Sequence, residues 1–467
     1  MILTVEEVLK VTGGNLVRGG GNVSFQGVST DSRTVSEGDL FIALRGPHFD
    51  GHQYASEALK KKAGGVLIEE DKVGDVRSNG DRSKAVIAVK DTLRALGDIA
   101  RDWRRKLGTP VVGLTGSNGK TTTKEMIAAC LETTFPVLKT KGNLNNLIGV
   151  PLTLLGLTEK ERVVVLEMGM NVPGEIRRLT EIAEPDVGLI TNIQKVHLEG
   201  MGDVDRLKEE KGELFRKMRR DGTIVVNQDD PRVTDLASDY PGQKITFGTE
   251  HPAEVMAKEI RLGGEEGTSF TLILEGEVVE IHLPLLGRHF VPNALSAVAI
   301  ACLFGVEVSQ IKMALERFKP FSMRMEVVPL EGGATLINDA YNANPYSTER
   351  ALETLVEAKG RGRAIAVLGD MLELGSFAKG AHEEIGAKVS DLSIDFLVVM
   401  GEEAPGIVES AVRHGLPINR TRVVESHSDA VSLLREMIRN GDWILVKGSR
   451  RMAMEKIVEG LAEGRVS

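Results

Sequence analysis

A glycine-rich segment at residues 113–123, GLTGSNGKTTT, carries the residue types that hold a phosphate group. Glycines let backbone N–H groups approach phosphate oxygens, Lys120 supplies a positive charge, and the Thr121 hydroxyl can complete the shell of a Mg²⁺ ion. The apolar run Pro110-Val111-Val112 precedes the segment, so we expect a strand, a loop and a helix in that order. Leu114 replaces the first glycine of the strict Walker A pattern, and the alternative is a chance glycine-rich turn. The segment therefore predicts a nucleoside triphosphate site formed by Gly116, Ser117, Asn118, Gly119, Lys120, Thr121 and Thr122.

Polar side chains end two of the apolar runs that follow. Glu167 ends the run 163–166, and Thr191-Asn192 ends the run 187–190, with His197 a few residues further on. Ligand sites of parallel sheets lie at the carboxyl ends of the strands, so Glu167 and His197 are candidate Mg²⁺ ligands. Histidine is an unusual ligand for so hard a cation. The alternatives are a helix-cap or salt-bridge acid for Glu167 and an ordinary polar loop residue for His197.

Lys211 lies in the middle of an apolar helical face. The predicted helix runs from Asp203 to Met218, and its apolar residues recur at a spacing of about 3.6 residues. Burial would lower the pKa of the Lys211 ammonium and favour the neutral amine, which can react with CO₂ to form a carbamate. The alternative is a snorkelling lysine whose stem packs while its ammonium group reaches water. A carbamate would convert a misplaced cation into a carboxylate-like metal ligand.

Three further polar clusters follow the middle section. Asn293, ahead of an alanine-rich helix, can hydrogen-bond a nucleotide base or cap the helix. Arg324 can reach a γ-phosphate across a domain boundary, and the alternative is an exposed surface arginine. The run 334–337 ends in the polar turn 338–345, NDAYNANP. Turn chemistry accounts for its final Asn-Pro but does not require Asp339 and Tyr341.

The alternation of strand-like and helix-like segments predicts an α/β protein of three domains. Residues 1–84 read as a small α/β unit that ends in a polar linker at 77–84. Residues 85–318 alternate short buried strands with helices, which predicts a mainly parallel sheet. Residues 319–467 repeat the alternation and predict a Rossmann-like domain. The expected strands are 39–44, 65–68, 111–115, 162–167, 186–191, 223–227, 334–339, 364–369, 395–400 and 443–447.

Composition narrows the class of protein. The 467 residues suffice for about three domains, and contents of 42% hydrophobic and 27% charged residues are typical of a soluble globular protein. The chain has neither an apolar run near the roughly 20 residues that span a bilayer nor the features of a signal peptide, so we expect a cytoplasmic protein without membrane insertion. Cys130 and Cys302 are the only cysteines, which excludes a disulfide framework. The net charge of −9 argues against a nucleic-acid surface.

In this order, the motifs closely resemble those of the Mur ligases, ATP-dependent amide-forming enzymes of peptidoglycan precursor synthesis, over essentially the whole chain. Three strings are similar to the MurF branch, which joins D-Ala-D-Ala to UDP-N-acetylmuramoyl-tripeptide: DAYNANP at 339–345, LGDMLELG at 368–375 and VKGSR at 446–450. The Asp-Asn-Pro-Arg motif that is usual in the MurE branch is not found. Two departures from the family pattern are Phe290, where many members have asparagine, and Met323, where glycine is common.

The resemblance also implies roles for individual residues. ATP would be held by residues 116–122, with one Mg²⁺ ion on Thr121 and Glu167 and a second on His197 and carbamylated Lys211. The implied catalytic residues are Lys120, His197, Lys211 and Arg324. The further implied nucleotide contacts are Asn146, Asn293, Arg324 and Asp339. The implied uridine diphosphate contacts are Ser29, Thr30, Asp31, Ser32, Arg33, Arg45, Gly46, Asp50, Gly51 and His52, and those near the peptide or dipeptide are Tyr341, Asn342, Asn344, Asp370, Lys447, Ser449 and Arg450.

The reaction that the resemblance implies proceeds through an acyl phosphate. The terminal carboxylate of the tripeptide would attack the γ-phosphate of ATP, and the amine of D-Ala-D-Ala would then displace phosphate to form the amide. The implied cofactors are ATP, two Mg²⁺ ions and a CO₂-derived carbamate, and a monomer would suffice. One alternative is folylpolyglutamate synthase, against which the three strings argue. The other is a P-loop regulatory ATPase that couples hydrolysis to a partner.

Overall fold

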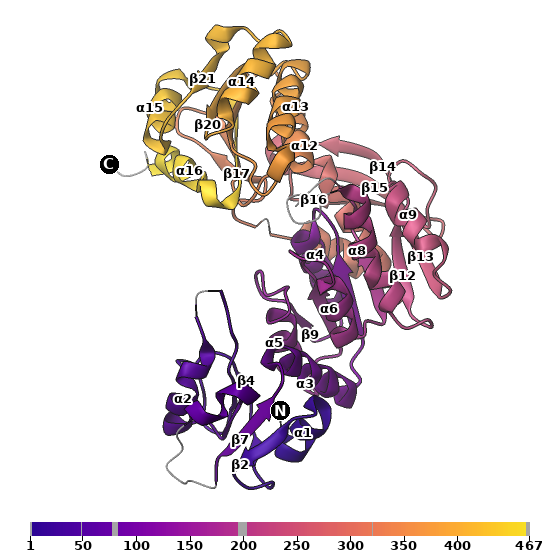
Figure 1. Cartoon of the computed structure of the whole chain (residues 1–467). Helices are drawn as coiled ribbons and strands as arrows, with labels where there is room; N and C mark the ends of the chain where they lie inside the picture. Colours follow the sequence, from indigo (N-terminus) through magenta and orange to yellow (C-terminus); the bar gives the residue numbers. More distant parts are fainter. Residues whose placement is uncertain (1, 48, 77–82, 195–202, 320, 464–467) are drawn as a thin grey trace.

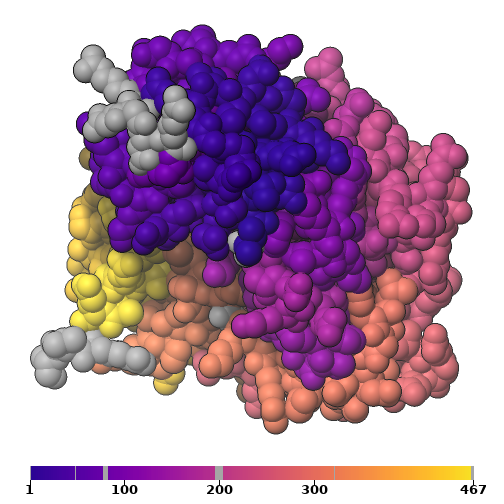
Figure 2. All heavy atoms as spheres, turned by 90° about the horizontal axis from the view of Figure 1, so that it is seen from below, coloured from indigo at the N-terminus to yellow at the C-terminus, as the bar shows by residue number. Residues whose placement is uncertain are grey.

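The computed structural model describes residues 2–47, 49–76, 83–194, 203–319 and 321–463. The chain forms three successive domains, which Figure 1 colours indigo, magenta to pink, and orange to yellow. Each domain contains its own β-sheet, which confirms the predicted three-domain α/β class. Seen from below, the first domain lies in front, and the third is visible beyond it on the left (Figure 2). Across the described ranges, every helix is too short or too polar to cross a membrane.

The first domain is built on a five-stranded sheet. Its elements are β1 (Leu3–Thr4), α1 (Val5–Thr12), β2 (Asn15–Arg18), β3 (Ser24–Phe25), β4 (Val28–Ser29), β5 (Leu40–Ile42), η1 (Gly51–Tyr54), α2 (Ala55–Lys61), β6 (Gly65–Glu69), η2 (Glu70–Asp75) and β7 (Ala85–Val89). The strand order is β2-β7-β6-β5-β4, with β2 antiparallel to β7 and the other pairs parallel. Because β7 pairs with β6 throughout its length, the predicted boundary after residue 84 would separate this strand from its own sheet. We propose a boundary after Val89.

The central domain is built on a nine-stranded sheet. Its elements are α3 (Thr92–Leu107), β8 (Val111–Thr115), α4 (Lys120–Glu132), β9 (Val137–Lys139), α5 (Gly149–Leu155), β10 (Val163–Glu167), α6 (Glu175–Ala183), β11 (Val187–Ile190), α8 (Val204–Lys217), β12 (Thr223–Asn227), α9 (Pro231–Ser238), β13 (Gln243–Gly248), β14 (Val255–Leu262), η3 (Gly264–Glu266), β15 (Thr268–Leu274), β16 (Glu277–Leu283), η4 (Arg288–Phe290), α10 (Val291–Leu303) and α11 (Val308–Glu316). The order is β16-β15-β14-β13-β12-β11-β8-β10-β9, parallel from β9 to β14, as predicted. The sequence prediction missed the antiparallel extension β14–β16, in which buried and partly exposed residues alternate along β15 because only one face is covered.

The third domain is built on a six-stranded sheet. Its elements are β17 (Glu326–Pro329), β18 (Thr335–Asp339), α12 (Pro345–Ala358), β19 (Ala364–Gly369), η5 (Gly375–Phe377), α13 (Ala378–Asp391), β20 (Phe396–Met400), α14 (Ala404–Arg413), η6 (Ile418–Arg420), β21 (Thr421–Val423), α15 (His427–Met437), β22 (Trp443–Lys447), η7 (Arg450–Met452) and α16 (Glu455–Ala462). The order is β17-β18-β22-β19-β20-β21, and β17 is antiparallel to β18 while the other pairs are parallel. The four strands predicted for this region are confirmed.

The two faces of the central sheet belong to different apolar cores. Alternate residues of β10 point to opposite faces of the sheet. Val164 belongs to a core that includes Phe25 of the first domain and Leu96 of α3. Val165 belongs to a second core that includes Leu352 of the third domain. The outer domains therefore extend the hydrophobic cores of opposite faces of the same sheet.

Helix α3 attaches the first domain to the central domain. A Cβ atom on Gly97 would lie 2.6 Å from a side chain of α6, so these two helices approach closely. Arg104 is 6% exposed and donates to Asp186 Oδ2 at 2.7 Å, beside β11. On the other side, Lys106 Nζ lies 2.8 Å from Glu7 Oε1 of α1. The same helix is thus packed against both domains.

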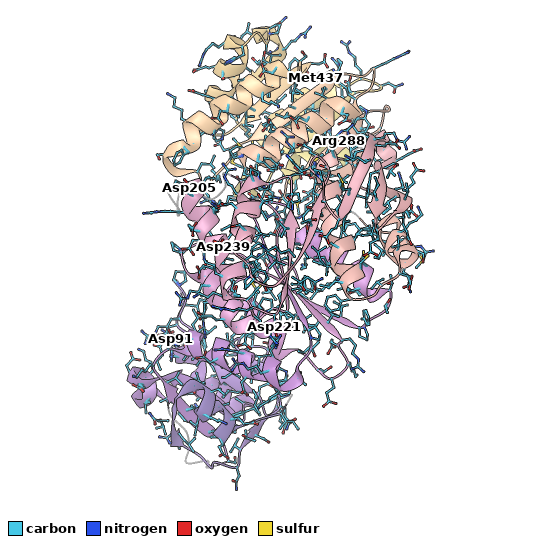
Figure 3. The ribbon with its side chains drawn as sticks, turned by 90° about the vertical axis from the view of Figure 1, so that its right-hand side faces the viewer. Asp91, Asp205, Asp221, Asp239, Arg288 and Met437 are labelled. Carbon is cyan, nitrogen blue, oxygen red and sulfur yellow. The ribbon has the colours of Figure 1, made fainter. Side chains whose placement is uncertain are left out.

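Side chains of the third domain contact the central domain at positions outside the phosphate loop. Arg288 donates to both carboxylate oxygens of Glu357, with Nε at 2.8 and 3.0 Å. Figure 3 shows Arg288 where the central strands meet the third domain. Thr335 Oγ1 donates to Glu265 Oε1 at 2.8 Å, which joins β18 to the β14–β15 connection. These contacts fix one side of the boundary between the two domains.

Candidate active site

The phosphate loop connects buried strand β8 to helix α4, as predicted. Gly116 and Gly119 have φ values of 150° and 78°, which L side chains rarely adopt. Neighbouring side chains also leave no room for a Cβ atom. On Gly116 it would lie 1.9 Å from Thr191 Oγ1, and on Gly119 it would lie 2.7 Å from Asn293 Oδ1. Because α4 begins at Lys120, its free N–H groups and positive dipole end face the loop.

The carboxyl end of β11 holds this loop in shape. Ser117 N donates to Asn192 O at 2.9 Å, and Asn118 N donates to Asn192 Oδ1 at 3.0 Å. Thr191 Oγ1 donates to Asn118 O at 2.7 Å. Gln194 N donates to Ser117 Oγ at 2.9 Å. Protein contacts therefore set the conformation of the loop, as preorganised electrostatic sites require.

Two lysines converge on one carbonyl oxygen of the loop. Lys120 Nζ and Lys211 Nζ each donate to Gly116 O at 2.9 Å. Burial lowers the pKa of Lys211 well below its ordinary value, and the charge of Lys120 lowers it further. Burial also lowers the pKa of Lys120, an effect that Glu167 opposes and Arg324 reinforces. Lys211 is only 3% exposed, so the alternative of a snorkelling lysine is wrong.

Glu167 has a buried carboxylate oxygen that receives no hydrogen bond from the described residues. It ends β10, is 2% exposed, and accepts from Asn145 Nδ2 through Oε1 at 2.9 Å. Its Oε2 has no donor and lies 4.0 Å from Lys124 Nζ, at the outer limit of an ion pair. A buried unpaired carboxylate oxygen is costly, and a hard divalent cation would satisfy it. The donor chemistry of Glu167 therefore fits a Mg²⁺ ion.

Besides Glu167, the described residues offer too few of the predicted ligands to complete the coordination shell of a Mg²⁺ ion. Thr121 follows Lys120 in the first turn of α4, and its hydroxyl is an oxygen donor of the kind that Mg²⁺ takes. His197 lies outside the described residues. Within the described ranges, no three His, Cys, Asp or Glu side chains are grouped to hold a metal. A Mg²⁺ ion beside Glu167 would thus need oxygen atoms from phosphate groups or water.

Sequence reasoning missed Asn145 and Lys124, which surround Glu167. Lys124 is 0% exposed and donates to Thr140 O at 2.8 Å, while Thr140 Oγ1 accepts from Glu167 N at 3.1 Å. Lys124 follows Lys120 by four residues, and this helical spacing would have placed both lysines on one face of α4. Asn145 gave no comparable signal, because its contact depends on the position of β10.

The asparagines predicted to contact adenine have different surroundings. Asn146 Oδ1 accepts from Gly149 N at 2.9 Å at the start of α5, so its nucleotide role stays a prediction. Asn293 is 7% exposed beside Gly119, inside the first turn of α10. The N-cap residue of α10 is Phe290, so the capping alternative for Asn293 is wrong.

The departure at Phe290 creates an apolar surrounding for a histidine. The Phe290 side chain is 5% exposed, and its ring centroid lies 4.2 Å from that of His289. Burial, reinforced by the charges of Lys447 and Arg350, lowers the pKa of His289 to about 3. The His289 imidazole is therefore neutral at ordinary pH.

The start of the third domain places Arg324 near the loop. Its guanidinium carbon lies 3.9 Å from the centroid of the Tyr341 ring, a cation–π distance. Arg324 is also close enough to Lys120 to lower the pKa of that lysine. Met323 has a φ of 62°, so the methionine keeps a left-handed conformation suited to glycine, at a cost of about 1–2 kcal/mol. The backbone at residue 323 therefore has a left-handed conformation although methionine stands where glycine is common in the family.

The polar turn after β18 is held by a buried lysine. Lys447 is 2% exposed, and its Nζ lies 2.5 Å from Asp339 Oδ2 and 3.0 Å from Asn342 O. Asp339 Oδ1 also accepts from Met325 N at 3.2 Å. Asp339 and Lys447 thus stabilise one another and the turn, and their predicted roles with nucleotide and peptide stay predictions.

Asn344 contacts the phosphate loop directly. It is the N-cap of α12, where its Oδ1 accepts from Ser347 N at 2.9 Å. Its Nδ2 donates to Asn118 Oδ1 at 2.8 Å, across the boundary between the domains. The structure therefore places Asn344 beside the predicted nucleotide site.

Three other predicted third-domain residues make contacts within that domain. Asp370 is 4% exposed and accepts from Glu402 N at 2.7 Å. Ser449 Oγ accepts from Leu372 N at 2.8 Å. Arg450 Nη1 donates to an acid of α16 at 2.8 Å. Their predicted role near the peptide stays untested.

The predicted uridine diphosphate segment forms ion pairs on the surface of the first domain. Arg33 Nη2 lies 2.7 Å from Asp31 Oδ2, and hydrogen bonds from Arg33 lower the pKa of Asp31 to about 2. Ser29 Oγ accepts from Asp31 N at 3.2 Å. Arg45 is also exposed, and its Nη2 lies 2.6 Å from Glu69 Oε2. These cations and hydroxyls suit phosphate contacts, although their partners here are protein groups.

His52 is a supporting residue of this segment. It is 4% exposed, its Nδ1 lies 2.5 Å from Asp50 Oδ1, and its Nε2 accepts from Glu69 N at 3.1 Å. An imidazole that accepts through Nε2 carries its proton on Nδ1, which donates to Asp50. His52 thus connects η1 to the end of β6.

Comparison with known proteins relates all three domains to one family. The Mur ligase family catalytic domain model matches residues 24–104, the Mur ligase middle domain model 114–301, and the Mur ligase glutamate ligase domain model 323–450. This chain belongs to the Mur ligase family. The family resemblance of the motifs is thereby confirmed.

Proteins named MurF are among the relatives that this chain resembles over nearly its full length. The chain is 38% identical over 441 residues to the UDP-N-acetylmuramoyl-tripeptide–D-alanyl-D-alanine ligase of Bacillus subtilis, covering 94% of each chain. The crystal structure of MurF from Acinetobacter baumannii matches with a TM-score of 0.89 at 30% identity over 99% of each chain. The MurF ligase of Thermotoga maritima in complex with ADP matches with a TM-score of 0.83 at 28% identity, covering 94% of this chain and 97% of that one. The predicted MurF branch is thereby confirmed over the two alternatives.

Proposed function

We propose that this chain is an ATP-dependent ligase that joins D-Ala-D-Ala to UDP-N-acetylmuramoyl-tripeptide. Full-length similarity to proteins named for that reaction carries the proposal. The site supports it independently, because the phosphate loop lies near a buried Lys211 and near a buried carboxylate oxygen of Glu167 that receives no hydrogen bond from the described residues. Such a set suits transfer of a phosphoryl group to a carboxylate.

The loop residues bind and orient ATP in this proposal. Lys120 leaves Gly116 O and pairs with the β- and γ-phosphates, while the N–H groups at the start of α4 donate to phosphate oxygens. Mg²⁺, held by Thr121 and Glu167, would offset the charge of the phosphates and of the approaching carboxylate. Asn146 and Asn293 contact the adenine, and Asp339 contacts ribose or phosphate.

The carboxylate of the tripeptide attacks the γ-phosphate, and ADP leaves with the electrons of the broken P–O bond. The dipeptide amine then attacks the acyl carbon, phosphate departs, and the amine loses a proton as the amide forms. Arg324 stabilises the charge on the transferred group, and the third domain excludes water that would hydrolyse the acyl phosphate. Dipeptide contacts fall to Tyr341, Asn342, Asp370, Lys447, Ser449 and Arg450.

Lys211 contributes as a carbamate in this proposal. Its neutral amine attacks CO₂, one proton is released, and the resulting anion serves with His197 as a metal ligand. The low pKa of the buried amine supports the first step, because only the unprotonated nitrogen reacts. The adjacent cation of Lys120 would stabilise the product.

The first domain holds the uridine diphosphate end of the substrate through the segment 29–52. The exposed arginines there suit its phosphates because they can exchange carboxylate partners for phosphate oxygens. The monomeric state, the cytoplasmic location and the absence of a nucleic-acid partner stay predictions from the sequence.

The decisive experiment measures ADP release with ATP, Mg²⁺, UDP-N-acetylmuramoyl-tripeptide and D-Ala-D-Ala, each omitted in turn, with products weighed by mass spectrometry. We expect release that needs both acceptor and dipeptide, and a product heavier than the tripeptide substrate by one dehydrated dipeptide. Release indifferent to both would refute the proposal and direct the search to folates or a protein partner.

A further inference from the structure

Two asparagine side chains form a hydrogen bond between the phosphate loop and the third domain. Asn344 Nδ2 donates to Asn118 Oδ1 at 2.8 Å, although the residues are 226 positions apart. Asn344 cannot turn its amide around, because its Oδ1 already accepts from Ser347 N at 2.9 Å as the N-cap of α12. Its N–H group must therefore point toward the loop.

The orientation of Asn118 follows from that of Asn344. Since Asn344 presents a donor, Asn118 presents its Oδ1, which directs its own Nδ2 elsewhere. Asn118 Nδ2 is buried and has no acceptor among the described residues. Hydrogen bonds to Asn192 and Thr191 hold the backbone of Asn118 on both sides, so the residue cannot swing into solvent. A buried amide N–H without an acceptor is costly, and an incoming acceptor would remove that cost.

We propose that Asn344 is a positioning residue that aims the Asn118 N–H group at an oxyanion of the bound reactants. The hydrogen bond makes the aim of a loop side chain depend on where the third domain sits. This inference rests on the proposed function, because the oxyanion is either a γ-phosphate oxygen of ATP or the terminal carboxylate of the tripeptide.

The test uses a variant that preserves the helix. Asn344→Ser keeps a good N-cap for α12, but the serine side chain is too short to reach Asn118. We expect an unchanged melting temperature and a fall in kcat of about tenfold, the scale of a lost positioning contact. The kcat of Asn118→Ala should fall at least as far as that of Asn344→Ser. The kcat of the double variant should fall no further than that of Asn118→Ala. Exposed Asn419 of the third domain provides the matched control, and Asn419→Ala should behave as the wild type.

Two further arms identify the oxyanion. If it is the γ-phosphate, Asn344→Ser should weaken binding of a non-hydrolysable ATP analogue about tenfold and leave ADP binding unchanged. If it is the carboxylate, the KM for the tripeptide substrate should rise and both nucleotide affinities should stay the same. The proposal would be overturned if Asn344→Ser changed neither the affinity for the ATP analogue nor the KM for the tripeptide substrate. It would also be overturned if the effects of the two single variants added fully in the double variant.

Hydrogen exchange separates this inference from the proposed function. Adding a non-hydrolysable ATP analogue together with the tripeptide substrate should slow exchange at the first amides of α12 in the wild type and not in Asn118→Ala, because the protection passes through this hydrogen bond. The measurement needs no amide product, so a wild type without ligase activity would leave it interpretable. Equal protection of α12 in both proteins would refute the contact.

Discussion

The phosphate loop and the segment 29–52 both hold polar side chains that suit phosphate, but these side chains are satisfied differently. Around the loop, Glu167 Oε2 and Asn118 Nδ2 are buried without hydrogen-bond partners among the described residues. In the first domain, Arg33 and Asp31 have side chains 85% and 38% exposed and pair with each other. A buried unpaired atom has a cost that a ligand removes, whereas an exposed ion pair is worth little and exchanges partners readily. The buried atoms without hydrogen-bond partners therefore identify the phosphate loop as a ligand site more strongly than the residue types identify the segment 29–52.

The largest expected effect is at Lys211, where burial and reactivity coincide. Lys211→Met should abolish amide formation, because methionine can form no carbamate. Where the amine carries no carbamate, the same change should also raise the free energy of unfolding near neutral pH, because the burial that lowers the pKa of Lys211 disfavours its charged form. The folded pKa lies below the unfolded one, so this gain should shrink as pH rises toward 10.5. Urea unfolding at several pH values and ADP release measure both effects.

Two companion variants control this prediction. Lys217, exposed at the end of the same helix, should tolerate Lys217→Met without loss of turnover. Lys211→Ala should regain partial activity with added short carboxylic acids, which can replace the carbamate. A fully active Lys211→Ala enzyme would refute the carbamate.

An intermediate effect is expected in the first domain. Arg45→Ala should raise the KM for the UDP-linked tripeptide about tenfold through loss of a charge-assisted contact, with kcat nearly unchanged. Its exposed ion pairs contribute little, so the free energy of unfolding should change by no more than about 0.5 kcal/mol. Steady-state kinetics against each substrate checks this. Arg261→Ala, which removes an exposed ion pair with Glu280 in the central domain, should leave every KM unchanged, and a similar rise there would refute the assignment.

The smallest effect concerns pH and the neutral His289. Its folded pKa of about 3 lies below the ordinary value of 6.5, so the unfolded chain binds more protons between these values. Its contribution to stability should therefore decline as pH falls from about 6.5 toward 3. Between pH 7 and pH 4, the melting temperature of His289→Gln should fall by less than that of the wild type. His251→Gln, which changes an exposed histidine, should lose as much as the wild type. Equal losses of melting temperature in all three proteins would contradict a lowered pKa for the half-buried His289 imidazole.

Features that depend on local pattern were predictable from the sequence. The strand, loop and helix around Lys120 follow from neighbouring residues, and the burial of Lys211 follows from helical periodicity. Glu167 was placed correctly because it ends an apolar strand. The order of the motifs along the chain was also enough to predict the family.

Features that depend on distant pairing were not predictable. We propose to move the predicted boundary from residue 84 to Val89, because only the pairing of β7 with β6 shows to which sheet that strand belongs. The partner of Asn344 is 226 residues away, and its own neighbours predict only a helix cap. Asn145 meets Glu167 only through the placement of a loop against β10. In each case tertiary contacts decide what the local sequence leaves open.

The packing of helix α3 reduces the number of domain movements that the proposed reaction needs. Because this helix is packed against α1 on one side and α6 on the other, the first and central domains are joined along a continuous surface, and their relative motion is restrained. A substrate held by the first domain and a nucleotide held by the loop would then keep a constant separation. Alignment of the reactants would depend on a single moving body, the third domain, and the search for a productive geometry would involve one hinge instead of two.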